Sequence, residues 1–240
     1  MKIGAIVQAR MSSRRFPGKV LHEVAGKPML QFLLERLAHC SSIEEVIVAT
    51  SCDPSDDALA EFCRKYDVGC HSGPLDDVAS RFLAAAEDRR YDAFVRVSGD
   101  SPLLDPRLID KAVSLFRSGD YDLVTNVLER TYPSGQSVEA LRTETFRSAY
   151  ALMTEAVDLE HVTTFFYRNN GEYRIHNFVC EPRRNAIHMS VDTPEDMSRF
   201  SATVACMVRP HWEYGLEEVV ALHSSAGRSL ATSTATNNRE

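Results

Sequence analysis

The sequence of 240 residues predicts an α/β protein with three layers, in which helices cover both faces of a mostly parallel sheet. Two observations support this fold class. Short apolar strands and helical patterns alternate through the first half of the chain, which is typical of βαβ units. Each long strand also runs into a polar loop. In open α/β sheets the ligand binds at such loops, at the carboxyl ends of the strands.

The first half of the chain alternates regularly between strand and helix. We expect strands at residues 3–7, 46–50, 68–71 and 93–97, where short apolar runs end in polar residues. We expect helices at residues 29–38, 57–66, 76–89 and 106–117, where apolar residues recur at helical spacing. Pro106 supports the start of the last of these helices, because proline is favoured in the first turn.

The alternation changes in the second half. Strand patterns occupy residues 123–126, 137–141, 173–179 and 186–191, and helical patterns occupy 143–154 and 159–168. A further helix begins at Thr193-Pro194 with a capping arrangement. These patterns predict a single domain over residues 1–223, with a small α+β insertion at about 126–185 over the carboxyl edge of the sheet. Residues 224–240 are rich in Ser, Thr, Ala and Asn, which predicts a disordered tail.

Composition argues against several classes of function. The net charge of −7 and the pI near 5.6 argue against a general nucleic-acid or membrane-surface binder. No apolar run reaches the roughly 18 residues of a membrane span, and the N-terminus lacks the layout of a signal peptide. Six scattered Cys without CxxC pairs are typical of reduced thiols in a cytoplasmic protein.

The loop after the first strand is strongly basic. Residues 8–19 hold three Arg and one Lys together with small residues, and a helix follows after a second loop element, Gly26-Lys27-Pro28. Backbone N–H groups, helix N-termini and fixed cations attract phosphate, so this segment predicts a phosphate site. Lys19 is fixed by Pro17-Gly18, and Arg10 and Arg15 can each clamp phosphate oxygens with two bonds. The alternative is a solvated basic loop. The segment matches neither the P-loop nor the dinucleotide-binding glycine pattern.

Two aspartates follow apolar segments far apart in the sequence. Asp100 comes after the strand at 93–97, and Asp192 comes after the pattern at 186–191. The ends of parallel strands share one edge, so the two carboxylates can converge on a divalent cation, and Mg²⁺ prefers one or two carboxylates with phosphate oxygens. Each Asp could instead cap the helix that follows it.

These segments resemble the cytidylyltransferases that make CMP-sugars, of the acylneuraminate and Kdo type, and most of all the spore coat polysaccharide biosynthesis protein F family. The resemblance covers roughly residues 1–200. It is carried by Arg10-x-x-Ser13-x-Arg15-x-Pro17-x-Lys19, residues 26–30, 72–81 and 130–139, Gly99-Asp100-x-Pro102, Glu160-His161-Val162-Thr163 and residues 191–196. Ser134 and Ser137 stand where that family has acidic residues, so the resemblance does not identify the acceptor.

The resemblance implies a nucleotidyltransferase of the Rossmann-like, nucleotide-diphospho-sugar transferase fold type. Its expected substrates are CTP and a sugar or sugar phosphate, its cofactor Mg²⁺ or Mn²⁺, and its by-product pyrophosphate. The expected role is surface polysaccharide biosynthesis, and a homodimer formed through the insertion is a further expectation. No membrane or nucleic-acid partner is expected.

Each candidate site residue has an expected role. Arg15, Lys19, Asp100 and Asp192 are the catalytic candidates, and the two Asp residues are also the metal ligands. The nucleotide-binding candidates are Gln8, Ala9, Arg10, Ser13, Arg15, Lys19, Thr50, Ser51, Arg81 and Gly99, and the acceptor-binding candidates are Glu139 and His161. Arg14 is expected on the surface. Arg81 could instead form a helical ion pair with Asp77, and Lys27 either reaches phosphate or lies exposed in a turn.

Two other functions remain open. A glycosyltransferase on a related fold would use an Asp-x-Asp metal motif after a strand, but Asp120-Tyr121-Asp122 precedes one. A non-catalytic nucleotide-sensing protein would be expected to lack the two carboxylates, and both are present. A general base is not assigned.

Overall fold

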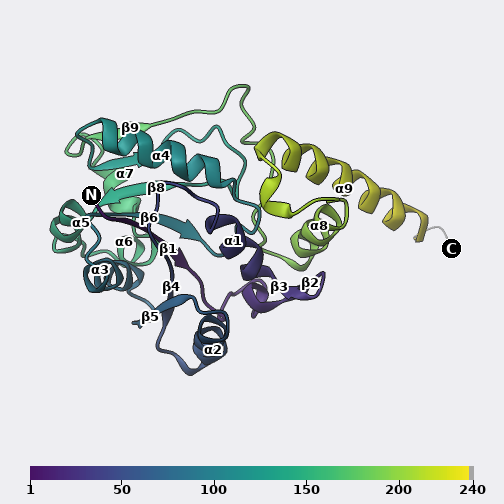
Figure 1. The fold of residues 1–240 in the computed structure, drawn as a ribbon, viewed down its shortest axis with the longest axis horizontal. Coiled ribbons are helices and arrows are strands. Elements are labelled where there is room, and N and C mark those ends of the chain that lie inside the picture. Colours follow the sequence, from purple (N-terminus) through teal and green to yellow (C-terminus); the bar gives the residue numbers. More distant parts are fainter. Residues whose placement is uncertain (238–240) are drawn as a thin grey trace.

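The centre of the molecule is a sheet with the strand order β5-β4-β1-β6-β8-β7-β9 (Figure 1). The computed structural model describes residues 1–237, and their side chains up to residue 228. The strands are β1 (Ile3–Gln8), β4 (Val46–Ser51), β5 (Gly69–Gly73), β6 (Ala93–Ser98), β7 (Leu123–Thr125), β8 (Glu139–Arg142) and β9 (Ile175–Asn177). Strands β5, β4, β1 and β6 pair in parallel, whereas β8 is antiparallel to both of its neighbours. The expected mostly parallel sheet is confirmed.

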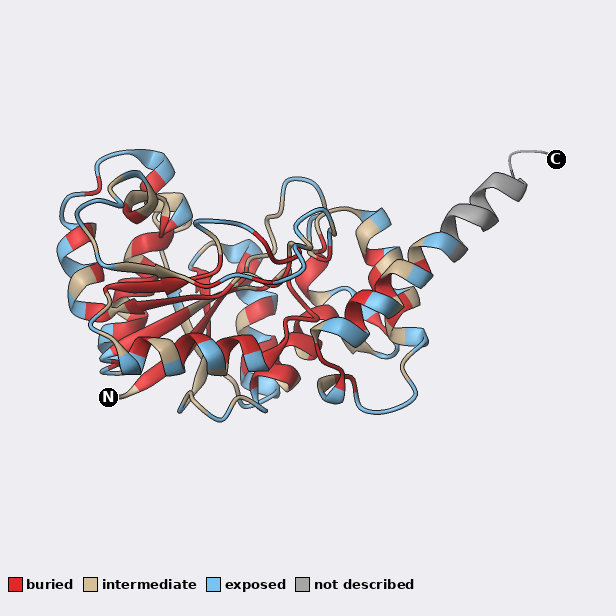
Figure 2. Cartoon of the chain, turned by 90° about the horizontal axis from the view of Figure 1, so that it is seen from above, coloured by how far each residue is buried: buried red, intermediate tan, exposed pale blue. Residues whose placement is uncertain are grey.

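Helices cover both faces of the sheet and create two apolar cores. The elements α1 (Met29–Leu37), α2 (Asp57–Lys65) and α4 (Pro106–Ser118) contribute to one core. The other core contains residues of α3 (Val78–Asp88), α5 (Thr143–Tyr150) and α7 (Thr164–Arg168). Figure 2 shows that buried residues follow the strands and the inner sides of the helices. Helices on both faces explain why β1, β4 and β6 are apolar at consecutive positions over most of their length rather than only at alternate positions.

The second half of the chain continues the sheet instead of only covering its edge. Strands β7, β8 and β9 all pair within it. The helix expected at 159–168 is interrupted, because α6 (Ala156–His161) and α7 are separate elements. The strand expected at 186–191 is absent from the described residues, and its segment forms only one isolated bridge, between Ser134 and His188. That strand prediction was wrong because an alternating extended segment can pack against loops without pairing in a sheet.

Two 3-10 helices and a short hairpin lie outside the main sheet. The 3-10 helix η1 (Lys19–Leu21) follows the basic loop, η2 (Pro54–Asp56) precedes α2, and a short antiparallel hairpin joins β2 (Glu23–Val24) to β3 (Lys27–Pro28). The hairpin turns at Ala25 and Gly26, which both have positive φ. Paired positive φ values are typical of tight hairpin turns.

The last elements of the described part of the chain are helices. Helix α8 (Pro194–Ala205) packs against α9 (Leu216–Asn237), with η3 (His211–Glu213) between them. Composition predicts disorder from residue 224, but α9 continues to residue 237, and residues 238–240 lie outside the described part. Among the described helices, none combines the length and the apolar character needed to cross a bilayer.

A fully buried arginine joins the N-terminal and C-terminal parts of the chain. Arg36 of α1 donates to the backbone carbonyls of Leu104 (2.7 Å), Tyr214 (2.8 Å) and His211. Burial lowers its pKa to about 10, so the guanidinium still keeps its charge at neutral pH. Three carbonyl dipoles therefore take the place of water around this cation.

Candidate active site

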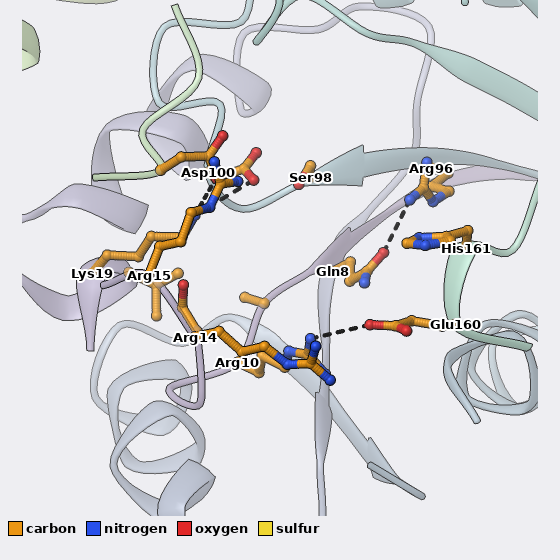
Figure 3. A pocket seen from close by; sticks show the side chains of 14 residues that line it. Gln8, Arg10, Arg14, Arg15, Lys19, Arg96, Ser98, Asp100, Glu160 and His161 are labelled. Carbon is orange, nitrogen blue, oxygen red and sulfur yellow. Dashed lines mark hydrogen bonds and ion pairs between the residues drawn. The ribbon is translucent and has the colours of Figure 1, made fainter. Parts of the chain in front are cut away.

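A polar cleft of about 370 Å³ opens at the carboxyl ends of β1 and β6 (Figure 3). Most of its walls come from the basic loop, the end of β6 and helix α6. Its lining residues are Gln8, Ala9, Arg10, Ser13, Arg14, Arg15, Lys19, Val20, Arg96, Ser98, Asp100, Glu160, His161 and Asp192. The cleft therefore lies where open α/β sheets bind ligands.

The basic loop is held by backbone bonds and one buried carboxylate. Gly18 has a φ of +75°, which glycine adopts without strain, and its N–H donates to the Met11 carbonyl at 2.8 Å. The N–H of Met11 in turn donates to Asp56 Oδ1 at 2.6 Å. Asp56 also accepts from the N–H of Ser51 at the end of β4. The backbone of the loop is therefore tied to the sheet edge by bonds within the protein.

Lys19 connects the two predicted metal ligands. Its ammonium group lies 3.0 Å from Asp192 Oδ1 and 3.6 Å from Asp100 Oδ2, and it donates to the Val191 carbonyl at 2.7 Å. Lys19 is only 7% exposed. Arg15, whose side chain is 65% exposed, reaches Asp192 Oδ1 at 3.0 Å. Two carboxylates from distant segments thus converge on one cationic atom.

Neither aspartate serves as a helix cap. Asp105 caps α4 by accepting from the N–H of Arg107, and Thr193 caps α8 in a capping box with Asp196. The alternative reading of both residues as caps is therefore wrong. Asp192 does not end a strand as expected, but the N–H of Val191 donates to the Asp100 carbonyl at 2.8 Å and brings the two segments together.

The donor set suits a magnesium-type ion. The carboxylates of Asp100 and Asp192 both hold the Lys19 ammonium and are both partly exposed to the cleft. Oxygen ligands of this kind, supplemented by phosphate oxygens and water, are what Mg²⁺ prefers. Among the described residues, no group of three or more His, Cys, Asp and Glu side chains is arranged to hold a metal. A metal here would therefore need further ligands from its substrate or water.

The other end of the cleft is formed by Arg10, Glu160 and His161. Arg10 Nη2 lies 3.4 Å from Glu160 Oε1, across 150 residues of sequence. Glu160 and His161 end α6, and the buried Val162 that follows has φ 56° and ψ −56°. The Thr163 N–H donates to the His161 carbonyl at 2.5 Å, which forms a γ-turn. This conformation is strained for a β-branched residue, and such strain is concentrated at functional sites.

Behind this end, Glu139 does not face the cleft as an acceptor ligand would. It is 2% exposed, pairs with Arg96 of β6 and accepts from the hydroxyl of Tyr167. Arg96 Nη2 also donates to Gln8 Oε1 at 3.2 Å. The expectation that Glu139 contacts the acceptor is wrong in this structure, because both of its oxygens are engaged in the interior.

Four nucleotide-binding candidates do not line the cleft. Thr50 and Ser51 are buried at the end of β4, and Ser51 is bonded to Asp56. Gly99 has a backbone role, since its N–H donates to the Gln8 carbonyl and a Cβ there would lie 2.9 Å from that oxygen. The fourth, Arg81, is buried outside the cleft lining.

Arg81 is bonded to the segment that follows β5. It is 1% exposed, and its Nη1 donates to the Pro74 carbonyl at 3.0 Å. Its Nε and Nη2 have no hydrogen-bond partner among the described residues. Burial lowers its pKa, as does the nearby charge of Arg10. The alternative ion pair with Asp77 is not formed, because Asp77 caps α3 and accepts from the Tyr150 hydroxyl.

Sequence reasoning missed several lining residues. Arg14 is exposed as expected but also lines the cleft, and Arg96, Ser98 and Glu160 were not among the candidates. Arg96 carried a usable signal, because a charged residue inside the apolar run Ala93-Phe94-Val95-Arg96-Val97 requires a partner.

Two other candidates lie outside the cleft. Lys27 pairs with Glu35 of α1 at 2.7 Å instead of reaching phosphate. Asp120 and Asp122 both form ion pairs with Arg174, so the Asp-x-Asp motif belongs to a structural ion-pair cluster.

Comparison of the sequence with known proteins shows the family to which the chain belongs. Residues 4–231 match the family model for cytidylyltransferases. The uncharacterized protein MJ1063 of Methanocaldococcus jannaschii is 32% identical over 83% of this chain and 82% of its own length. Spore coat polysaccharide biosynthesis protein SpsF of Bacillus subtilis is 26% identical over 82% of this chain and 84% of its own. A 3-deoxy-manno-octulosonate cytidylyltransferase of Geobacter metallireducens is 41% identical, but over 48% of this chain and 44% of its own.

Solved structures agree with this result. A cytidylyltransferase from Leptospira borgpetersenii superposes with a TM-score of 0.90 and 26% identity, covering 95% of this chain and 96% of its own. CMP:2-keto-3-deoxy-manno-octonic acid synthetase, solved with CTP, superposes with a TM-score of 0.67 over 85% of this chain and 99% of its own. Its sequence identity to this chain is 19%, so the similarity is evidence for a shared fold only. With a family model that spans nearly the whole chain, this protein belongs to the cytidylyltransferase family of nucleotidyltransferases.

Proposed function

We propose that this protein transfers a cytidylyl group from CTP to a sugar or sugar-phosphate acceptor, in a metal-dependent reaction of surface polysaccharide biosynthesis. The observation that carries the proposal is the Lys19 ammonium held between Asp100 and Asp192 in a cleft with several arginines. A cationic cleft with two convergent carboxylates suits phosphoryl transfer, which depends mainly on positioning and charge stabilisation. The SpsF and octulosonate relatives support a sugar acceptor.

The reaction breaks one bond and forms one. An acceptor oxygen attacks the α-phosphorus of CTP and loses its proton, and pyrophosphate leaves with the electron pair of the broken P–O bond. Lys19 and Arg15 bind phosphate oxygens and offset the charge that develops on them. Asp100 and Asp192 would hold a Mg²⁺ or Mn²⁺ ion, which supplies further charge neutralisation at the phosphates when bound.

The cleft also separates two regions with different tasks. Lys19, Arg15 and Asp100 lie at one end, and Gln8, Arg96, His161 and Glu160 lie at the other (Figure 3). We assign the first end to the phosphates and metal and the second to the acceptor sugar. Asp120 and Asp122 both form ion pairs with Arg174. The Asp-x-Asp motif that the glycosyltransferase alternative requires is therefore not at the cleft.

A pyrophosphate-release screen tests the proposal. The four nucleoside triphosphates are combined with Mg²⁺ and a panel containing 3-deoxy-manno-octulosonate, N-acetylneuraminate, glucose 1-phosphate and ribitol 5-phosphate. We expect release with CTP and one acceptor, loss of release in EDTA, and recovery with Mg²⁺ or Mn²⁺. Asp100→Asn serves as the inactive control. Sugar transfer from a nucleotide sugar without pyrophosphate release would instead establish a glycosyltransferase.

A further inference from the structure

The amide of Gln8 has only one chemically sensible orientation. Its Oε1 lies 3.2 Å from Arg96 Nη2. A guanidinium group has donors and no acceptor, so the amide atom that faces it must be the carbonyl oxygen. The amide nitrogen then points away from Arg96, as Figure 3 shows. No group among the described residues accepts a hydrogen bond from this nitrogen, although Gln8 lines the cleft.

A buried carboxylate fixes Arg96. Strand β8 runs antiparallel to β6, and the register pairs Arg96 with Glu139, the first residue of β8. Arg96 Nη1 donates to Glu139 Oε2, and Glu139 is almost fully buried. Moving Arg96 away would leave that carboxylate unpaired in the interior, which is strongly unfavourable. Arg96 therefore stays where it faces Gln8.

Tyr167 completes the arrangement. Its hydroxyl donates to Glu139 Oε1, and it lies 2.9 Å from Thr125 Oγ1. Burial and the adjacent Glu139 charge raise the pKa of Tyr167, so the hydroxyl keeps its proton and remains a donor. An inverted Gln8 amide would place its NH₂ group against Arg96 and lose a hydrogen bond in a confined site. The three residues thus hold the Gln8 carbonyl inward and its NH₂ outward.

The surroundings of this NH₂ group suit a sugar. Apart from Ala9, the lining residues near Gln8 are Arg10, Arg96, Ser98, Glu160 and His161, which are all polar, and none of them has an aromatic carbocycle. A nucleobase is usually bound with apolar or aromatic contacts to its faces. A sugar instead presents hydroxyl and carboxylate oxygens that match polar side chains.

We propose that Gln8 is a specificity-determining donor to an oxygen atom of the acceptor, and that Arg96, Glu139 and Tyr167 are positioning residues that orient it. This inference rests on the proposed cytidylyl transfer to a sugar. Glu139 thus influences acceptor use without touching the acceptor.

Gln8→Glu is the sharpest test, because it keeps the side-chain shape and the oxygen that faces Arg96 but replaces the NH₂ donor by an oxygen. Gln8→Met is the uncharged companion. With the acceptor that supports release in wild type, we expect both changes to raise KM for that acceptor about tenfold or more, with KM for CTP unchanged. Gln31→Leu, which removes an amide bonded to Glu35 on α1, is the matched control.

The positioning residues can be tested without any substrate. The chain contains only three glutamines, at 8, 31 and 136, so side-chain amide signals of ¹⁵N-glutamine-labelled protein can be assigned by single substitutions. We expect Tyr167→Phe to shift the Gln8 amide signals and leave the other two in place. Tyr150→Phe is the matched control, since it removes a tyrosine–carboxylate hydrogen bond to Asp77 away from the cleft. We also expect Tyr167→Phe to raise KM for the acceptor about threefold or more.

Several results would overturn the inference. If Gln8→Glu has the same KM for the acceptor as wild type, Gln8 is not a donor to the acceptor. If instead only the KM for CTP rises, Gln8 binds the nucleotide. Unchanged Gln8 signals in Tyr167→Phe would remove the positioning role. If wild type releases no pyrophosphate with any acceptor, the proposed function fails separately. The sugars of the panel then serve directly as probes, and a Gln8 shift with CTP–Mg²⁺ but with none of them would overturn the acceptor assignment.

Discussion

The backbone N–H of Val191 donates a 2.8 Å hydrogen bond to the carbonyl oxygen of Asp100, although the two residues are 91 positions apart in the chain. This bond places Asp192 beside Asp100, and the Lys19 ammonium then joins both carboxylates and the Val191 carbonyl. The metal-binding candidates are therefore assembled by backbone pairing between loops, not by neighbouring strands.

Asp100→Asn and Asp192→Asn should each lower turnover on the order of 10²–10³-fold, because charge stabilisation at the phosphates is the main catalytic contribution expected here. Each change also leaves the buried Lys19 ammonium with one carboxylate fewer, so we expect the free energy of unfolding to fall by about 1–3 kcal/mol. Pyrophosphate release and urea denaturation measure the two effects. Near-wild-type turnover in both variants would exclude these carboxylates from the mechanism.

Arg15→Ala should weaken CTP–Mg²⁺ binding about tenfold with little change in stability, because its side chain is 65% exposed. Calorimetric titration gives the affinity and thermal denaturation gives the stability. Arg117→Ala, at an exposed arginine of α4, controls for the loss of one positive charge. Equal CTP affinities in the two variants would argue against Arg15 as a phosphate ligand.

Lys19→Met should lower both CTP affinity and stability. A solvated basic loop was the alternative interpretation of the sequence, but Lys19 is buried and bonded to two carboxylates. Removing its ammonium leaves Asp100 and Asp192 close together with only the exposed Arg15 to offset their charge, so the repulsion between them increases. Added Mg²⁺ should therefore raise the melting temperature of this variant more than that of wild type. The absence of any extra Mg²⁺ effect would show that the two carboxylates do not share a cation site.

Arg81→Ala should act mainly on stability, in contrast to the nucleotide role expected from sequence. Its stem is buried, and its guanidinium donates to the Pro74 and Leu75 carbonyls. We expect the free energy of unfolding to fall by about 2–4 kcal/mol. Arg81→Met keeps most of the volume and should recover part of the loss. A large drop in CTP affinity at unchanged stability would instead return Arg81 to the nucleotide site.

Acidification should destabilise the protein through two buried histidines. Burial lowers the pKa of His211 and of His223 below the ordinary value of 6.5. The unfolded chain then binds more protons than the folded one below about pH 6.5, so the free energy of unfolding falls as the pH drops. Urea midpoints between pH 7.5 and 5 measure this dependence. The double variant His211→Gln/His223→Gln should show a shallower slope, whereas His22→Gln, at an exposed imidazole, should match wild type.

The sequence predicted the parts of the fold that are governed by local pattern. The apolar runs of β1, β4 and β6 and the basic loop could be recognised, because buried parallel strands and phosphate loops have distinct compositions. The placement of Thr50, Ser51 and Glu139 could not be predicted. The position of a residue in a strand does not tell whether its polar side chain faces a cleft or an interior partner. The position of Glu160 at the cleft could not be predicted either. Glu160 lies near the end of α6, just before the γ-turn at Val162, and no local sequence pattern predicts that turn.

The buried Arg36 guanidinium has a consequence for synthesis of the protein on the ribosome. Two of its three carbonyl partners, at His211 and Tyr214, are made about 175 residues after Arg36 itself. Until they emerge, an N-terminal fragment that contains all the strands of the parallel core offers this guanidinium only the Leu104 carbonyl, and the side that His211 and Tyr214 contact is left without these partners. The final packing around Arg36 therefore depends on the arrival of the C-terminal segment. Chain termination before residue 214 should leave a product open to proteolysis rather than a smaller stable domain.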